Sequence, residues 1–287
     1  MREPVRSDGD QEVRHFRTLF ISDVHLGTKG CQADRLLRFL QTHTCDHMYL
    51  VGDIIDGWQL KSSFYWPETH MEVVRELLRH LKQNTKVTYV TGNHDELLRK
   101  YSNVEFGNLR LVDETAHTTA DDRKLLVIHG DQFDVVTRYH RWVAVLGDIS
   151  YSILLGLNRW LNWWRERFGY DTWSLSAWVK GKVKSAVNHL SNFEAALAKE
   201  CKRQHYDGVV CGHIHHAEHS IIGEVEYFNC GDWVESCTAL LEDSDGKIVV
   251  YRDSDENSNV TKLKVRRFRS PKSTRKVAAA SNTSLYR

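Results

Sequence analysis

Short apolar runs alternate with polar segments along most of the chain. Five runs are rich in β-branched residues and end at glycine or serine: TLFIS, HMYLVG, VTYVTG, LLVIHG and DGVVCG. Runs of this kind are typical of strands buried on both faces of a sheet. Between the first three lie the helical patterns ADRLLRFLQT and THMEVVRELLRHLKQN, the second with an apolar stripe from Val73 to Leu81. Strand, helix, strand in this order predicts a layered α/β domain.

The pattern changes after Gly212. The segments EVEYFNC, CTALLE and KIVVYR are typical of strands, with EDSDG as a tight turn between the last two. The patterns divide the chain into a polar N-terminal segment (1–17), a main domain (18–252) with a helical insertion (133–204), and a basic tail (253–287) that we expect to be disordered.

The composition of the chain bears on its cellular compartment but does not indicate which reaction it catalyses. The chain has 287 residues and a formal net charge of +1, so charge alone indicates no class of partner. The N-terminus lacks an apolar signal-peptide core, and no apolar stretch is long enough to span a bilayer. Six scattered cysteines without a CxxC pair favour a reduced, cytoplasmic protein over a disulfide-bonded one.

Each of the five apolar runs is followed directly by aspartate, asparagine or histidine. In open α/β sheets, ligand sites form beyond the carboxyl ends of strands. A carboxylate in such a place is costly to dehydrate unless something pairs with it, and in GDIIDGW this carboxylate is Asp53. The five strand ends supply Asp23, His25, Asp53, Asn93, His94, Asp95, His129, Asp131, His213 and His215.

This set of side chains predicts a metal centre. Carboxylate and amide oxygens with imidazole nitrogens, and no cysteine, suit Mn²⁺, Fe²⁺ or Zn²⁺. The side chains are too many for one ion, but they fit two ions that share a bridging carboxylate. Two ions about 3.5–4 Å apart are the usual arrangement for hydrolysing phosphate esters. Any one of the short motifs could be an ordinary turn; their occurrence together and in order favours the metal site.

The series DVH…GD…GNHD…HGD…GHIH resembles the calcineurin-like metallophosphoesterases over roughly residues 18–252. The resemblance implies a four-layer αββα sandwich, two packed sheets flanked by helices, with a helical cap. It implies that Asp53 bridges two divalent ions, Mn²⁺ preferred, and that the catalytic residues are His94, which stabilises the transition state or protonates the leaving oxygen, and Asp95, which orients it. Asp56 and Asp131 would support the ligands. The first ion would be held by Asp23, His25 and His215, and the second by Asn93, His129 and His213.

Within that family, ISDVHLG and GDIIDGW are most similar to the UDP-2,3-diacylglucosamine hydrolases of lipid A synthesis. That resemblance implies cleavage of a nucleotide-linked glycolipid to UMP and 2,3-diacylglucosamine 1-phosphate. The chain departs from the group at His94, where its members carry arginine, and at Glu96, where they carry an aromatic residue. A sister branch with another substrate therefore stays open.

The insertion at 133–204 contains six of the nine tryptophans, interleaved with arginine and lysine. These side chains either pack the inserted helices together or form a cap whose apolar groove takes acyl chains and whose basic residues take phosphate. Tryptophan, leucine and arginine together also suit a membrane interface. The candidate substrate-binding residues are Trp142, Arg159, Trp163 and Trp164.

Three functional classes follow from the sequence. The first is a pyrophosphatase acting on a nucleotide-linked lipid, in the cytoplasm or peripherally on the inner membrane. The second is a phosphodiesterase or nuclease of the same fold, for which the basic tail after Glu256 is the only indication. The same tail could contact an anionic membrane, which we favour over nucleic acid as a partner. The third is a non-catalytic scaffold, which the complete ligand set disfavours.

Overall fold

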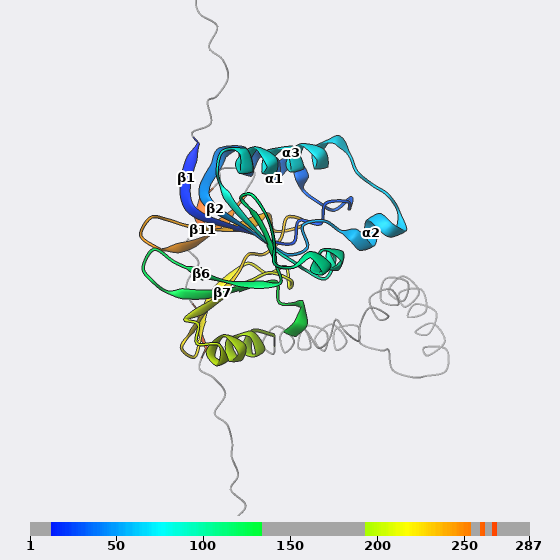
Figure 1. Cartoon of the computed structure of the whole chain (residues 1–287). Coiled ribbons are helices and arrows are strands. Elements are labelled where there is room, and N and C mark those ends of the chain that lie inside the picture. Colours follow the sequence, from blue (N-terminus) through cyan, green and yellow to red (C-terminus); the bar gives the residue numbers. More distant parts are fainter. Residues whose placement is uncertain (1–12, 134–192, 254–258, 262–265, 269–287) are drawn as a thin grey trace, which may run out of the picture.

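Two β-sheets pack face to face, with helices on their outer faces (Figure 1). The computed structural model describes residues 13–133 and 193–253, and two short strands at 259–261 and 266–268. The predicted α/β sandwich is confirmed. The inserted segment falls mostly outside the described residues.

The first sheet contains eight strands in the described part of the chain, in the order β13-β12-β11-β1-β2-β3-β5-β4. Its central strands β1, β2 and β3 are parallel, and β5 continues the parallel pairing beyond β3. The strands are β1 (Arg14–Ile21), β2 (His43–Val51), β3 (Lys86–Val90), β4 (Val104–Phe106), β5 (Leu109–Val112), β11 (Thr238–Glu242), β12 (Ile248–Arg252) and β13 (Asn259–Thr261).

The second sheet contains six strands in the described residues, in the order β14-β9-β10-β8-β7-β6. Its centre is also parallel, because β8 pairs in parallel with both β7 and β10. The strands are β6 (Glu114–Thr118), β7 (Lys124–Ile128), β8 (Gly208–Cys211), β9 (Glu218–Ile222), β10 (Val225–Asn229) and β14 (Arg266–Phe268).

Helices complete the layers. Helices α1 (Ala33–Thr42) and α3 (Glu68–Lys82) cover the first sheet, and a helix at 193–203 covers the second (Figure 1). Shorter helical turns follow strand ends: α2 (Gly57–Ser62), η1 (Glu96–Tyr101) and η2 (Asp131–Phe133).

Burial of both faces of the first sheet explains why its central strands are apolar at nearly every position. In β1, Leu19 and Ile21 pack into the core beneath α1 and α3, whereas Phe20 between them packs into the core between the two sheets. Alternate side chains of a strand point to opposite faces, so a strand covered on both faces carries apolar residues at every position.

Two short strands lie within the segment that the sequence predicts to be a disordered tail. Strand β13 pairs antiparallel with β12, and β14 pairs in parallel with β9. Both extend a sheet at an open edge, where unpaired backbone groups accept another strand. Such pairing uses the backbone, so a basic, non-periodic sequence does not reveal it.

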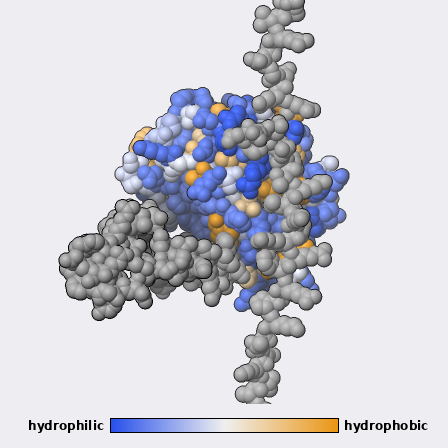
Figure 2. Space-filling model, turned by 180° about the vertical axis from the view of Figure 1, so that it is seen from behind, coloured by the Kyte–Doolittle hydropathy of each residue, from blue (hydrophilic) through white to orange (hydrophobic). Residues whose placement is uncertain are grey.

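The helices of the described residues are all too short or too polar to cross a membrane. On the reverse side of the molecule, the coloured surface is mainly hydrophilic with scattered apolar patches (Figure 2). Single exposed apolar residues of this kind are normal on protein surfaces.

Candidate metal centre

The carboxyl ends of parallel strands from both sheets meet at one edge of the sandwich. Strands β1, β2 and β3 deliver candidate ligands from the first sheet, and β7 and β8 deliver theirs from the second. Three overlapping groups form there, within each of which the ligand atoms lie within 4.8 Å of one another. The groups are Asp23, His25 and His215; His25, Asp53 and His94; and Asp53, His129 and His213.

Five of these side chains leave the backbone from a left-handed conformation, with φ between 52° and 71°. Residues other than glycine rarely adopt it, and each such residue costs of order 1–3 kcal/mol. Strain that recurs at three of the five strand ends of one cluster, those after β1, β2 and β8, indicates that these turns are shaped for the site and not for stability. The five are Asp23, His25, Asp53, His213 and His215.

Two glycines make room for the carboxylates. A Cβ atom at Gly92 would run into Oδ1 and the backbone nitrogen of Asp53. A Cβ atom at Gly212 would collide with Ser22 and with Oδ2 of Asp23. The backbones of the third and fifth strand ends therefore approach the two aspartates more closely than any other residue type allows.

Each aspartate is anchored through one oxygen. Asp53 accepts a hydrogen bond at Oδ1 from the backbone N–H of His94 (2.8 Å), while its Oδ2 lies 3.3 Å from Nε2 of His129. Asp23 accepts at Oδ2 from the backbone N–H of His213 (2.9 Å), while its Oδ1 lies 3.2 Å from Nε2 of His215. In both residues the second oxygen faces the imidazoles.

Two histidines are oriented through Nδ1. His129 donates to the carbonyl of Val51 (2.9 Å), and Nδ1 of His25 lies 3.1 Å from Oδ2 of Asp56. Such outer contacts fix the tautomer of metal-binding histidines. They leave Nε2 as the free nitrogen of each ring.

The buried polar atoms of the cluster fit a cation. Nε2 of His25, Oδ1 of Asn93 and Nε2 of His129 are buried and make no hydrogen bond within the described residues. An acceptor left unsatisfied in the interior costs about 1–3 kcal/mol. Here the atoms come from three different strand ends and all can donate a lone pair, so a divalent ion would supply the missing partner.

Charge coupling links the carboxylates to His129. Burial alone would lower the pKa of His129, but the negative charges of Asp53 and Asp23 raise it above its usual value. Burial alone would raise the pKa of Asp53, but the interaction with His129 brings it well below the usual range. Metal ligands must be deprotonated, so metal affinity at these residues should fall as the pH is lowered.

Asp56 contacts His94, whereas the sequence-based expectation assigned that contact to Asp95. Oδ2 of Asp56 lies 2.9 Å from Nδ1 of His94. The carboxylate of Asp95 instead points into the core, where it accepts hydrogen bonds from the N–H groups of Gly92 and Ile54 and from the hydroxyl of Tyr89. Asp95 holds the loop that carries Asn93 and His94 and does not orient the His94 ring.

Asp131 pairs with an arginine that the sequence did not single out. Nη2 of Arg99 lies 2.8–2.9 Å from both carboxylate oxygens of Asp131. Arg99 belongs to η1, so the pair ties this turn to the loop after β7, which carries His129. No sequence spacing marks the pair, because 32 residues separate its members.

The predicted substrate residues Trp142, Arg159, Trp163 and Trp164 lie outside the described residues. One tryptophan beside the centre, Trp58, was missed as a site residue, although it closes the GDIIDGW segment. Its ring centroid lies 4.1 Å from that of His94.

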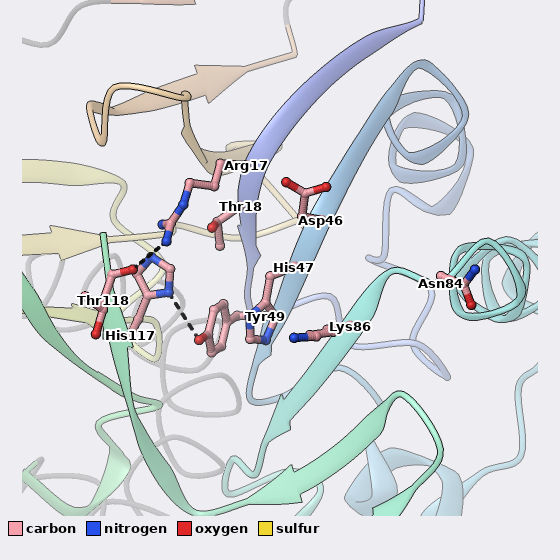
Figure 3. Close-up of a pocket in the computed structure, with 9 residues that line it drawn as sticks. All are labelled: Arg17, Thr18, Asp46, His47, Tyr49, Asn84, Lys86, His117 and Thr118. Atoms are coloured by element: carbon pink, nitrogen blue, oxygen red, sulfur yellow. Dashed lines mark hydrogen bonds between the residues drawn. The ribbon is translucent and has the colours of Figure 1, made fainter. Parts of the chain in front are cut away.

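A cavity of about 480 Å³ lies elsewhere, near the start of the parallel strands (Figure 3). It contains none of the candidate ligands. Beside it, Glu242 accepts hydrogen bonds from Arg17 (2.6 Å) and His117 (2.8 Å), and His117 also contacts the hydroxyl of Tyr49 (3.2 Å). These polar groups bond mainly to one another, so they stabilise this end of the sandwich.

Comparison with solved structures gives distant matches. Vacuolar Protein Sorting 29 from Cryptosporidium parvum is 16% identical, with a TM-score of 0.46 over 85% of this chain and 94% of that one. The phosphoesterase Yfce from E. coli is 15% identical, with a TM-score of 0.43 over 85% and 95%. The nuclease MPE from Pseudomonas putida is 28% identical, with a TM-score of 0.24 over 34% and 48%.

No curated protein matches the sequence significantly. The model of the calcineurin-like phosphoesterase family, in contrast, matches residues 16–217. The match spans all seven candidate metal ligands and more than half of the chain. The chain therefore belongs to the calcineurin-like phosphoesterase family of metal-dependent hydrolases.

Proposed function

We propose that the protein hydrolyses phosphodiester or pyrophosphate bonds with two divalent ions bound at the strand ends. The observation that carries the proposal is the overlap of the three ligand groups: Asp53 belongs to two of them, and His25 links the second to the first. A shared carboxylate between two sets of nitrogen and oxygen ligands suits an ion pair about 3.5–4 Å apart, which clamps the attacking and leaving oxygens of a phosphoryl group.

The residues divide into two ligand sets around Asp53. The first set is Asp23, His25 and His215, and the second is Asn93, His129 and His213. Ions bound there would lower the pKa of the attacking water and neutralise charge on the phosphoryl group. The mixture of oxygen and imidazole ligands suits Mn²⁺, with Fe²⁺ or Zn²⁺ as alternatives.

The role proposed for His94 is at the leaving group. Its contact with Asp56 engages Nδ1 and leaves Nε2 as the atom that can donate to a leaving oxygen. Its side chain is 26% exposed, compared with 8% for His25 and 1% for His129, so a substrate can reach it more readily. Positioned proton donors of this kind contribute about 10²–10⁴-fold to the rate.

For the substrate, we propose UDP-2,3-diacylglucosamine or a related nucleotide-linked lipid, which would yield UMP and 2,3-diacylglucosamine 1-phosphate. The support comes from ISDVHLG, GDIIDGW and the tryptophan-rich segment at 133–204. Residues Trp142, Arg159, Trp163 and Trp164 would contact the lipid and phosphate groups. The basic tail would hold the enzyme at an anionic membrane surface in the cytoplasm, at about 1 kcal/mol per basic residue.

A second candidate is a phosphodiesterase or nuclease that acts on nucleic acid or another soluble phosphodiester. It is favoured by the nine basic residues and the absence of acidic ones after Glu256, since phosphate backbones attract the same charges. A nuclease needs an open basic trench beside the ions, whereas a lipid enzyme needs an apolar pocket.

A substrate panel with Mn²⁺ separates the candidates: UDP-2,3-diacylglucosamine, nucleotide-sugars without acyl chains, single-stranded DNA and bis-p-nitrophenyl phosphate. The lipid proposal predicts selective turnover of the acylated substrate, with KM rising as the chains shorten, because each buried methylene contributes about 0.8 kcal/mol. Equal turnover of nucleotide-sugars without acyl chains would contradict it, and selective turnover of DNA would favour the nuclease.

The double variant Trp163→Ala with Trp164→Ala tests the acyl groove. It should weaken turnover of the acylated substrate and spare bis-p-nitrophenyl phosphate, because the residues that would hold the ions lie at the strand ends of the two sheets. If both activities and the melting temperature fall together, the two tryptophans serve packing and the groove proposal fails.

A further inference from the structure

The ring of His94 contacts two other aromatic rings. It meets His25 edge-on, with centroids 4.6 Å apart and an interplanar angle of 84°. It lies obliquely against the indole of Trp58, with centroids 4.1 Å apart at 38°. The edge-to-face geometry with His25 is one that aromatic rings favour, and the shorter distance to Trp58 places the imidazole and indole rings in close van der Waals contact.

Two hydrogen bonds join Trp58 and its neighbour Gly57 to the segment that carries His94. Its indole Nε1–H donates to Oε1 of Glu96 (3.2 Å), two residues beyond His94. The backbone N–H of Gly57 donates to the carbonyl of His94 (3.0 Å). A side-chain bond and a backbone bond therefore join the start of α2 to the loop that enters η1.

His94 needs such support more than its neighbours do. His25 and His129 are nearly buried, so packing fixes their rings in addition to the contact at Nδ1. The side chain of His94 is 26% exposed, so its contacts with Asp56 and with the ring of His25 restrain it on fewer sides. The indole of Trp58 packs against the His94 ring and limits its movement on a further side.

We propose that Trp58 and Glu96 are positioning residues that fix the His94 ring for its contact with the leaving group. This inference rests on the proposed function, in which His94 donates to the leaving oxygen. Neither residue needs to touch the substrate. A displacement of about 1 Å at a reacting group can cost 10²-fold in rate, so the loss of the indole should slow the chemical step.

The test compares Trp58→Leu with Trp58→Phe, and Glu96→Ala with Glu96→Gln, on Mn²⁺-loaded enzyme and aryl phosphodiesters of graded leaving-group pKa. Trp58→Leu and Glu96→Ala should lower kcat by about 10–100-fold on the poorest leaving groups, less on the best, with KM unchanged. Glu96→Gln keeps an acceptor for the indole N–H, so it should retain most of the activity. Trp58→Phe keeps an aromatic face but loses the N–H donor to Glu96, so its loss should resemble that of Glu96→Ala and stay smaller than that of Trp58→Leu.

A comparison of the Trp58→Leu effect with and without His94 shows whether Trp58 acts by positioning His94 or has a general structural role. In a His94→Ala background, Trp58→Leu should cause no further loss. An equal loss in both backgrounds would show that Trp58 acts elsewhere, and a raised KM with unchanged kcat would show that it contacts the substrate; either result overturns the proposal.

A crystal structure of the Trp58→Leu protein provides a readout that does not depend on activity. The His94 ring should leave its present orientation or lose its 2.9 Å contact with Asp56; an unchanged ring would overturn the proposal. If the wild-type enzyme cleaves no phosphodiester, the proposed function fails, while the structure still decides whether Trp58 positions His94. Should Trp58→Leu fail to fold, Glu96→Ala takes its place in each measurement.

Discussion

Oδ2 of Asp56 lies 2.9 Å from Nδ1 of His94. The same oxygen lies 3.1 Å from Nδ1 of His25, so one carboxylate supports both a candidate ligand and the candidate proton donor. Its other oxygen, Oδ1, accepts from the backbone N–H of Gln59 (2.8 Å) and caps α2.

Asp56→Asn should therefore impair metal binding and turnover together. The amide keeps an oxygen for the cap but loses the charge that both imidazoles face. We expect metal affinity to fall by about 10–100-fold, as for other outer partners of metal-bound histidines. Titration with Mn²⁺ followed by calorimetry measures this. An unchanged affinity would mean that Asp56 does not orient His25.

His94→Ala should leave both ions bound and lower turnover by about 10²–10⁴-fold. The loss should shrink for substrates with good leaving groups, because these need no proton. Metal analysis of the purified variant is the check on the assignment. Loss of an ion would make His94 a ligand, as its grouping with His25 and Asp53 allows.

Gly92→Ala should weaken metal binding by a steric clash, without any change of charge. The added Cβ would collide with Asp53, so the carboxylate or the loop must shift. Overpacking of this kind costs about 1–3 kcal/mol in the free energy of unfolding, and we expect at least a tenfold loss of metal affinity. Gly30→Ala is the matched control, since its Cβ would meet only a methyl group of Val234 at 3.2 Å. Equal behaviour of the two variants would contradict the close-approach argument.

Glu242 makes stability depend on pH at the opposite end of the sandwich. Burial opposes its ionisation, but the hydrogen bonds that it accepts, above all from His117, lower its pKa from 4.5 to about 2. Because the folded-state pKa is the lower one, its contribution is fully present above pH 4.5 and is lost as the pH falls toward 2.

Glu242→Gln should thus lower the free energy of unfolding by about 1.5–3 kcal/mol at pH 7, and the difference should shrink between pH 4.5 and 2. Urea unfolding across this range measures it. Glu105→Gln is the control, because Glu105 is 67% exposed and pairs with Arg110 on the surface. A pH-independent difference would show that shape, and not charge, is the cause.

The clustering of the candidate ligands could be predicted from the sequence because its signal is local. Each ligand directly follows an apolar strand, and parallel strands deliver their carboxyl ends to one edge. Strands β4 and β6 escaped notice because they are short or largely polar and exposed, so no apolar run marks them.

The partner of His94 could not be read from the sequence. Chain proximity favours Asp95, but successive side chains at a turn point in different directions. The side chain of Asp95 turns inward to Tyr89, and the contact comes instead from Asp56 in the neighbouring loop. The contact between Trp58 and Glu96 could not be read from the sequence for the same reason, since 38 residues separate the two.

We propose that Asp53 is shared by two ions that carry out the hydrolysis. The most direct measurement is metal content and bis-p-nitrophenyl phosphate turnover in Asp53→Asn, beside Asp46→Asn, which changes a 74% exposed aspartate on β2, the strand that precedes Asp53. We expect close to two ions per chain and full activity in wild type and Asp46→Asn, with both properties lost together in Asp53→Asn. A folded Asp53→Asn protein that keeps near-normal metal content and turnover would contradict it.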